Sequence, residues 1–159
     1  RVMNQKIRDR ELKKYYLCIV HGTLPRPAGR LEGYILKDEA KKQVTVSSRP
    51  RPGAKTAVTL YETLAVRNGL SLVRCQLITG RTHQIRAQFA AAGHPLLGDG
   101  KYGSERQNKR YGRSYQALYS YRLEFCFTTD AGALAPLDGQ QFQVEQVDFV
   151  TEYFPGFSL

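Results

Sequence analysis

The alternation of apolar and polar positions predicts a chain dominated by β-strands. Residues 15–20 are rich in aromatic and β-branched side chains and are apolar on both faces, which is typical of a central strand. Residues 57–66 and 70–78 alternate apolar with polar side chains, the second run less cleanly. Because the turn-forming residues 67–69 separate them, the two runs predict a β-hairpin.

One well-defined helix is predicted in the middle of the chain. Its apolar face consists of Ile85, Phe89 and Ala92. Thr82 is the predicted N-terminal cap, and Gly93, followed closely by a proline, ends the helix. Two further strands are predicted at residues 117–128 and 142–150.

The first eleven residues have apolar side chains at helical spacing among charged ones, which predicts an amphipathic helix. No capping residue precedes it, so we expect the sequence to start inside a longer polypeptide. The length of 159 residues fits one domain. We therefore predict that residues 1–159 form a single domain truncated at its N-terminus.

Residues 26–55 predict a loop-rich basic arm, with short strands around 34–36 and 44–46. The whole chain has 24 Lys and Arg against 14 Asp and Glu, a net charge of +10. Such a charge favours a polyanionic partner, with nucleic acid as the first candidate. The arm is therefore either an ordinary solvated surface or a phosphate-contacting segment.

The cysteines and the hydropathy restrict the function classes further. Cys18, Cys75 and Cys126 are far apart and odd in number, so we expect buried, reduced thiols and neither a disulfide framework nor a metal site. No apolar run approaches the roughly 20 residues that cross a bilayer, and no signal peptide is evident. We predict a cytoplasmic protein with no membrane partner.

The segment 77–86 ends a strand, turns on Gly80 and opens the predicted helix. On that helix Arg86 lies roughly 90° round from the apolar face, with small alanines beside it. An arginine there can approach the interior only if a carboxylate meets it, because an unpaired buried guanidinium is prohibitively costly. The alternative is a surface arginine whose stem covers apolar area.

The string Leu-Ile-Thr-Gly-Arg-Thr-His-Gln-Ile-Arg at 77–86, continuing through Gly-His-Pro-Leu-Leu-Gly-Asp at 93–99 to Tyr-Gly at 102–103, closely resembles the signature of the RluA-type family of RNA pseudouridine synthases. Segments near residues 14–22, 55–61 and 117–125 agree with it. The resemblance covers nearly the whole chain.

The resemblance implies an α/β (α+β) fold with a mostly antiparallel mixed sheet flanked by helices. It also implies isomerisation of a specific uridine in ribosomal or transfer RNA by base flipping, without a cofactor or a metal. By motif position, Arg86 and Tyr16 are the catalytic candidates. Arg86 would pair with an essential aspartate, and Tyr16 would lie beside the flipped base. Core packing is the alternative for Tyr16. We expect a monomer.

The resemblance places the essential aspartate in a His-Arg-Leu-Asp motif upstream of the first helix, and this motif does not occur in the sequence. Asp9 and Asp38 lie in unlike contexts, and Asp99 belongs to the loop of the signature. None of the three is assigned as the catalytic residue. We therefore predict that the chain alone is inactive. The alternative is a noncatalytic RNA-binding module.

Other residues of the signature are candidates for substrate binding. They are Arg81, Thr82, His83 and Gln84, with Lys14 on the first strand. His21, His83 and His94 do not have the spacing of a metal site. We also expect that replacing Arg86 by alanine abolishes turnover and leaves the protein folded.

Overall fold

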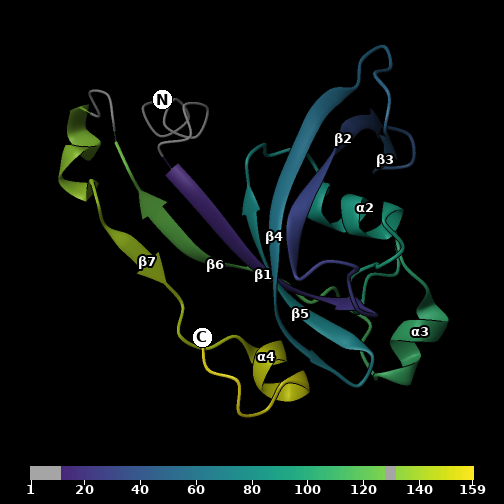
Figure 1. Cartoon of the computed structure of the whole chain (residues 1–159). Coiled ribbons are helices and arrows are strands. Elements are labelled where there is room, and N and C mark those ends of the chain that lie inside the picture. Colours follow the sequence, from purple (N-terminus) through teal and green to yellow (C-terminus); the bar gives the residue numbers. More distant parts are fainter. Residues whose placement is uncertain (1–11, 128–131) are drawn as a thin grey trace.

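The computed structural model describes residues 12–127 and 132–159, so the predicted helix at 1–11 lies outside the described residues. Seven strands form one sheet in the order β3-β2-β4-β5-β1-β6-β7, and every described pair is antiparallel (Figure 1). The strands are β1 (Leu12–His21), β2 (Ala28–Asp38), β3 (Gln43–Ser47), β4 (Lys55–Arg67), β5 (Leu70–Leu77), β6 (Leu118–Phe125) and β7 (Gln141–Gln143). The helices are α2 (Gln84–Ala91), α3 (Glu105–Arg110), α4 (Asp148–Tyr153) and a 3₁₀ helix, η1 (Gly132–Leu137). The predicted antiparallel sheet flanked by helices is confirmed.

Strand β1 lies in the interior of the sheet, where it pairs with β5 on one side and β6 on the other. Its alternate residues Leu17 and Ile19 point to one face, and Cys18 and Val20 point to the opposite face. All four are fully buried, so both faces of β1 are covered. This confirms the prediction of a central strand from its apolar character on both faces.

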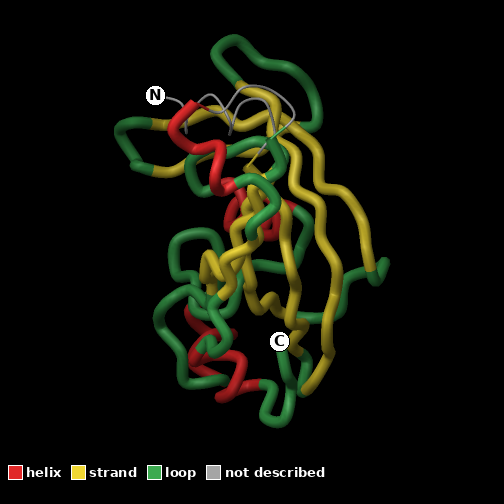
Figure 2. The backbone as a smooth tube through the Cα atoms, turned by 90° about the vertical axis from the view of Figure 1, so that its left-hand side faces the viewer, coloured by secondary structure: helices red, strands yellow, loops and turns green. Residues whose placement is uncertain are grey.

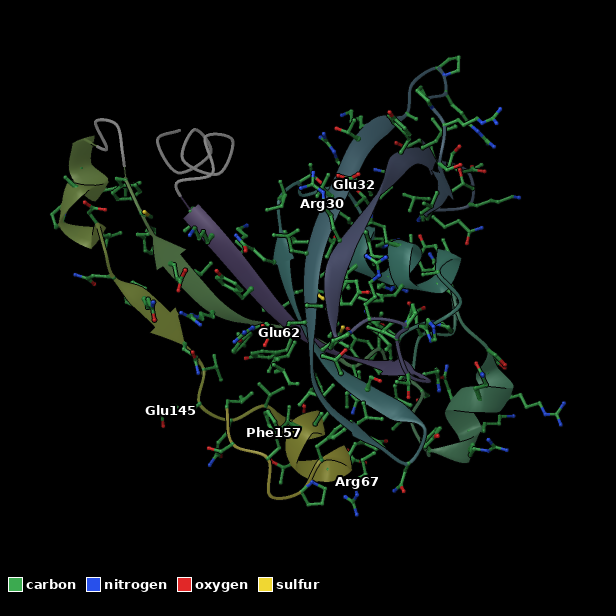
Figure 3. All side chains as sticks on the ribbon, in the orientation of Figure 1. Arg30, Glu32, Glu62, Arg67, Glu145 and Phe157 are labelled. Carbon is green, nitrogen blue, oxygen red and sulfur yellow. The ribbon has the colours of Figure 1, made fainter. Side chains whose placement is uncertain are left out.

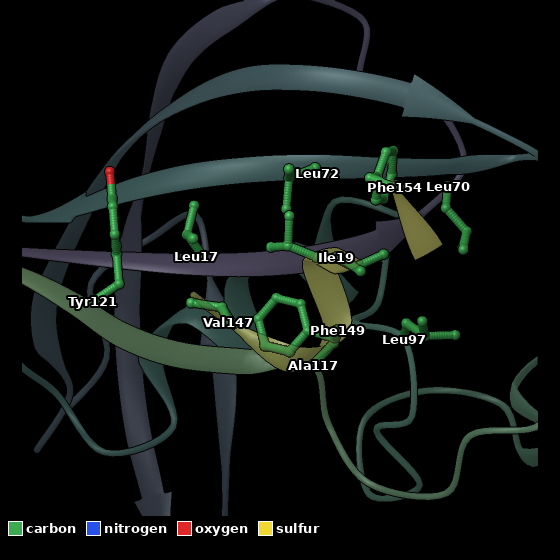
Figure 4. Packing of buried hydrophobic residues seen from close by; sticks show 11 residues of the cluster. Leu17, Ile19, Leu70, Leu72, Leu97, Ala117, Tyr121, Val147, Phe149 and Phe154 are labelled. Atoms are coloured by element: carbon green, nitrogen blue, oxygen red, sulfur yellow. The ribbon is translucent and has the colours of Figure 1, made fainter. Parts of the chain in front are cut away.

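Two helices cover opposite faces of the sheet. On one face α4 packs against Leu17 and Ile19, and Figure 4 shows the ring of Phe149 next to Ile19 and Val147. On the other face α2 places Phe89 against Cys18 and Val20 of β1. The long strands curve along the height of the molecule between these layers (Figure 2).

The hairpin of β4 and β5 turns at Asn68 and Gly69, as predicted. Both residues have positive φ, 52° and 76° respectively. Positive φ at both central positions is the geometry of a type I′ turn, which asparagine followed by glycine favours. The far ends of these strands lie beside the N-terminus of α2, because β5 ends at Leu77.

The basic arm is more regular than expected, because β2 and β3 take up much of residues 26–55. Strand β2 pairs with both β3 and β4, so hydrogen bonds to two neighbours order a segment whose glycines suggested loops. A Cβ atom at Gly29 would lie 2.7 Å from the Tyr61 hydroxyl. This glycine therefore marks a close approach within a strand.

The C-terminal segment also differs from its prediction. Residues 142–150 were expected to form a strand, but β7 ends at Gln143 and α4 begins at Asp148. The buried residues Val147, Val150 and Phe154 follow helical spacing, which the sequence pattern did not distinguish from a strand. The preceding strand, β6, ends at Phe125, short of the predicted residue 128.

The cysteine prediction holds for two of the three residues. Cys18 and Cys75 are buried free thiols with their sulfur atoms 3.9 Å apart. Cys126 is exposed because β6 has already ended before it, so its predicted burial is wrong. Within residues 12–127 and 132–159, no helix has the length and apolar character needed to cross a membrane.

Candidate active site

The helix α2 begins at Gln84 and not with a cap at Thr82, which is exposed. The residue at the cap position is His83, which has a left-handed backbone with φ 53° and makes no capping bond with its side chain. The side chain of Gln84 instead bonds the turn that precedes the helix, since its Oε1 accepts from the backbone N–H of Arg81 (3.0 Å) and from the Thr79 hydroxyl (2.7 Å). The prediction of Thr82 as the cap is therefore wrong.

A buried polar network fixes α2 against the sheet. Gln84 Nε2 donates to the carbonyl of Val58 (3.0 Å) and to the hydroxyl of Thr59 (2.8 Å). Thr59 donates in turn to Gln88 Oε1 (2.7 Å), and Gln88 Nε2 donates to the carbonyl of Ala57 (3.2 Å). Such a fully bonded network specifies one orientation of the helix. Gln84 is only 3% exposed, which favours a positioning role over direct contact with substrate.

The buried face of α2 therefore includes both glutamines together with Ile85, Ala87 and Phe89. Ala92, predicted to lie on this face, is exposed because α2 ends at Ala91. Gly93 has φ 89° and its N–H bonds to the carbonyl of Ala90, so the predicted glycine stop is confirmed.

Arg86 pairs with Asp99 through two hydrogen bonds. Its Nε donates to Asp99 Oδ2 (2.8 Å), and its Nη2 donates to Asp99 Oδ1 (3.0 Å). The side chain of Arg86 is 14% exposed and that of Asp99 is fully buried. Of the two alternatives for Arg86, the structure shows the one in which a carboxylate meets it, and the surface-arginine alternative is excluded. The partner within the described residues is Asp99, which the sequence left unassigned.

The pKa values of this pair shift in the directions that stabilise both charges. The hydrogen bonds to Asp99 raise the pKa of Arg86 above its ordinary value. Burial alone would raise the pKa of Asp99, but Arg86 and the backbone N–H groups of Tyr102 and Lys101 outweigh it and hold that pKa below its usual range. The pair is therefore ionised at neutral pH.

Tyr102 and His83 complete the surroundings of Arg86. The Cζ atom of Arg86 lies 5.2 Å from the centroid of the Tyr102 ring, in the range of a cation–π contact. The Tyr102 hydroxyl accepts from the backbone N–H of Val44 (2.9 Å) and is hydrogen-bonded to His83 Nδ1 (2.8 Å). Burial, followed by the positive charges of Arg86 and Lys101, lowers the pKa of His83. This shift favours the neutral form of His83.

Tyr16 of β1 and Arg86 of α2 line the same pocket, of about 340 Å³, which we call the Tyr16–Arg86 pocket. The described residues that line it are Tyr16, Leu77, Arg81, His83, Gln84, Ile85, Arg86, Gln116 and Leu118. Five of the seven predicted site residues are thus brought together. No aspartate or glutamate is among these described lining residues.

The remaining two predicted residues lie in adjoining pockets. A pocket of about 320 Å³ extends along β1 and is lined by Lys13 and Lys14, and it shares Tyr16 and Arg81 with the first. Another, of about 200 Å³, is lined by Lys37, Lys55, Gly80, Arg81 and Thr82, among others. Arg81 is common to all three pockets, and its Nε donates to the carbonyl of Thr56 (2.7 Å).

Three residues of the site were not predicted. They are Asp99 and Tyr102, which lie beside Arg86, and Gln116, which lines the pocket. The place of Asp99 and Tyr102 in the signature string was the only signal for these two residues, since pairing across the fold is invisible to helical periodicity. Gln116 had no such signal. Among the described residues, no group of three or more His, Cys, Asp or Glu side chains is arranged to hold a metal ion.

Comparison with known sequences identifies the family. A family profile described as RNA pseudouridylate synthase matches residues 1–91, more than half of the chain. The chain therefore belongs to the RNA pseudouridylate synthase family. Its predicted RluA-type character is confirmed by curated relatives that are RNA pseudouridine synthases, including a ribosomal large subunit pseudouridine synthase D.

Two of these relatives show the extent of the match. An uncharacterized RNA pseudouridine synthase of Bacillus subtilis is 38% identical over 104 residues, which is 64% of this chain and 33% of the relative. The ribosomal large subunit pseudouridine synthase D of Zymomonas mobilis is 32% identical over 145 residues, which is 91% of this chain and 42% of the relative. The chain thus spans less than half the length of either relative.

The fold is also that of solved pseudouridylate synthase domains. The structure of human RNA pseudouridylate synthase domain containing 4 superposes with a TM-score of 0.68 at 23% identity, covering 92% of this chain and 62% of that one. The structure of human RNA pseudouridylate synthase domain containing 1 gives 0.65 at 20% identity, covering 94% and 68%. At these identities the likeness concerns the fold alone.

Proposed function

We propose that this chain supplies the base-binding side of the active cleft of an RNA pseudouridine synthase that modifies a specific uridine in ribosomal or transfer RNA. The observation that carries this proposal is that Tyr16 and Arg86, which the family motifs single out, come from different elements and line one pocket. The target nucleotide would leave its stack to enter the Tyr16–Arg86 pocket. The parent protein would act as a cytoplasmic monomer, with residues 1–159 in a single domain.

The reaction is an isomerisation that balances without a further reactant. The bond from ribose C1′ to uracil N1 breaks, the base turns, and C1′ bonds to C5, which loses its proton to solvent while N1 gains one. Tyr16 would present its aromatic face to the uracil, and its hydroxyl could exchange protons. Arg86 keeps Nη1 available beside the pocket for a further oxygen anion, because its bonds to Asp99 use Nε and Nη2.

The essential carboxylate would come from upstream of the described residues. Asp99 cannot contact a base in the pocket, since its side chain is fully buried and bonded to Arg86. No carboxylate occurs among the described pocket-lining residues. We therefore propose that the aspartate lies in a His-Arg-Leu-Asp motif preceding residue 1, and that the complete reading frame is active where the chain alone is not.

Tritium release tests this function directly. The complete reading frame, incubated with ribosomal and transfer RNA labelled at uracil C5, is expected to release tritium, and residues 1–159 alone are expected to release none. A Tyr16→Phe variant keeps the aromatic face and loses the hydroxyl, so it separates stacking from proton exchange. Absence of release from either RNA pool would refute the proposal.

A second candidate function is a noncatalytic RNA-binding module. It is favoured by the lack of a carboxylate among the described residues of the pocket. RNA binding without isomerisation, by the longest reading frame that contains these residues, would establish it.

The salt dependence of RNA binding gives a further prediction. Lys14 lines a pocket that adjoins the active one, and no acidic residue is among the described residues lining it. By contrast, two cations of the basic arm pair with neighbouring acids, Arg30 with Glu32 and Lys37 with Glu39, and Figure 3 shows Arg30 beside Glu32 on β2. We expect phosphate contact at Lys14 in preference to Arg30.

Replacing Lys14 by alanine should therefore reduce the slope of log K against log salt by about 0.7 to 0.9, the value of one lost phosphate contact. The matched control is Arg67→Ala, which removes the same charge at the end of β4 (Figure 3). Arg67 pairs with Leu70, at the opposite end of β5 from the pocket residue Leu77. The slope is measured by RNA titrations at several salt concentrations. Equal slopes for the two variants would contradict a phosphate contact at Lys14.

A further inference from the structure

We propose that Asp99 is a positioning residue that holds the guanidinium of Arg86 in one orientation at the Tyr16–Arg86 pocket. This inference rests on the proposed function, and it adds a residue that would act through Arg86 without touching the RNA. The two hydrogen bonds between the side chains, at 2.8 and 3.0 Å, are the starting observation.

The geometry leaves Arg86 little freedom. A bidentate pair fixes the plane of the guanidinium as well as its position. The ring of Tyr102 lies under the guanidinium, so a second group restricts its tilt. Arg86 would thus meet its substrate or its catalytic partner without first losing side-chain freedom.

Asp99 is itself held on every side. Its Oδ1 accepts from the backbone N–H groups of Lys101 (3.0 Å) and Tyr102 (3.1 Å). Its own carbonyl accepts from Asn108 Nδ2 (3.2 Å) and from the N–H of Gly103 (3.1 Å). The carboxylate therefore has a fixed place relative to the loop that carries it.

Asn108 connects this loop to the strand that bears Tyr16. Its Oδ1 accepts from the backbone N–H of Gly98 (2.8 Å) and from Nε2 of His21 (2.8 Å). His21 is the last residue of β1, and Tyr16 lies on the same strand. Hydrogen bonds through Asn108 of α3 thus tie the end of β1 to the backbone of Asp99, whose side chain in turn holds Arg86.

Stability alone does not explain a carboxylate at this position. A buried ion pair is often no more stable than well-packed apolar residues of the same volume, because both charges must be desolvated. The side chain of Arg86 is 14% exposed and that of Asp99 is 0% exposed, so the cost of desolvation applies to both charges. What an apolar pair could not supply is a cation of fixed orientation at the pocket.

The test is Asp99→Asn in the complete reading frame. This change keeps the size of the side chain and removes its charge, so we expect kcat to fall about 100-fold, the effect of misplacing a reacting group by about 1 Å, while KM for RNA changes little. The NMR signal of Arg86 Nε–H, protected from exchange in the wild type, should lose that protection. Asp38→Asn, the same change at the end of β2, should alter none of these quantities.

The outcomes separate positioning from structure and from the function itself. Phe149→Leu, on the opposite face of the sheet, serves as a variant of lowered stability, and all kinetics are measured where each variant is folded. Wild-type kcat in Asp99→Asn, or retained protection of the Arg86 signal, would overturn the positioning role. If the wild type releases no tritium, the proposed function fails, and the Arg86 signal alone then decides whether Asp99 orients the guanidinium.

Discussion

Replacing Arg86 by alanine is expected to lower the free energy of unfolding by about 3–5 kcal/mol, since it leaves a buried carboxylate without its partner. Asp99 is fully buried, and the two backbone N–H groups that remain to it do not neutralise its charge. Urea denaturation of the wild type and the variant measures this loss. An Arg86→Ala variant as stable as the wild type would show that the ion pair contributes nothing to folding.

This expectation changes what the alanine variant can reveal about catalysis. A domain is stable by only about 5–15 kcal/mol in total, so Arg86→Ala can lose activity simply by unfolding. The sequence alone led us to expect a folded, inactive protein, because Asp99 was not identified as the partner. A double variant, Arg86→Met with Asp99→Asn, removes both charges and should recover most of the lost stability.

The double variant then isolates the role of the guanidinium. If it unfolds near the wild-type urea concentration and still releases no tritium, the loss belongs to catalysis. Full activity of this variant would refute the role proposed for Arg86. Arg86→Lys supplies a third comparison, since it keeps the charge and loses the bidentate geometry.

The sequence predicts correctly those strands and turns whose local pattern is compatible with only one secondary structure. Residues 15–20 are apolar on both faces, and the turn at Asn68 and Gly69 has a strong intrinsic preference for positive φ. The strand β2 was underestimated because its order comes from hydrogen bonds to β3 and β4, which local composition does not encode. The helix α4 was mistaken for a strand because a short apolar run is compatible with both periods.

In the candidate site, too, local pattern predicted some features, and contacts between distant segments determined the others. Helical geometry placed Arg86 at the boundary of its helix and left two alternatives, a surface arginine or one that meets a carboxylate, and the structure shows the second. It could not choose the carboxylate, because Asp99 approaches through a loop thirteen residues further along the chain. The burial of Gln84 and Gln88 was equally hidden, since polar side chains become core residues only when partners such as Thr59 meet them.

Gly98→Ala is expected to lower the free energy of unfolding by about 2–5 kcal/mol. A left-handed backbone at alanine costs about 1–2 kcal/mol, and overpacking against the neighbouring backbone costs about 1–3 kcal/mol. Gly98 has φ +83°, and a Cβ atom there would lie 1.9 Å from the backbone oxygen of Tyr115. The matched control is Gly100→Ala, where a Cβ atom meets nothing within 4 Å and φ is not positive, so its stability should change by less than about 0.5 kcal/mol.

Because backbone cannot move aside as a flexible side chain does, the loop at Gly98 must shift to admit the alanine. Gly98 directly precedes Asp99, and its N–H donates to Asn108, so the shift should move the carboxylate that orients Arg86. Tritium release by folded Gly98→Ala should accordingly fall, while Gly100→Ala retains wild-type activity. Equal stability of the two variants would contradict the close packing of this loop. A Gly98→Ala variant that is destabilised but fully active would show that the packing of the loop does not control the orientation of Arg86.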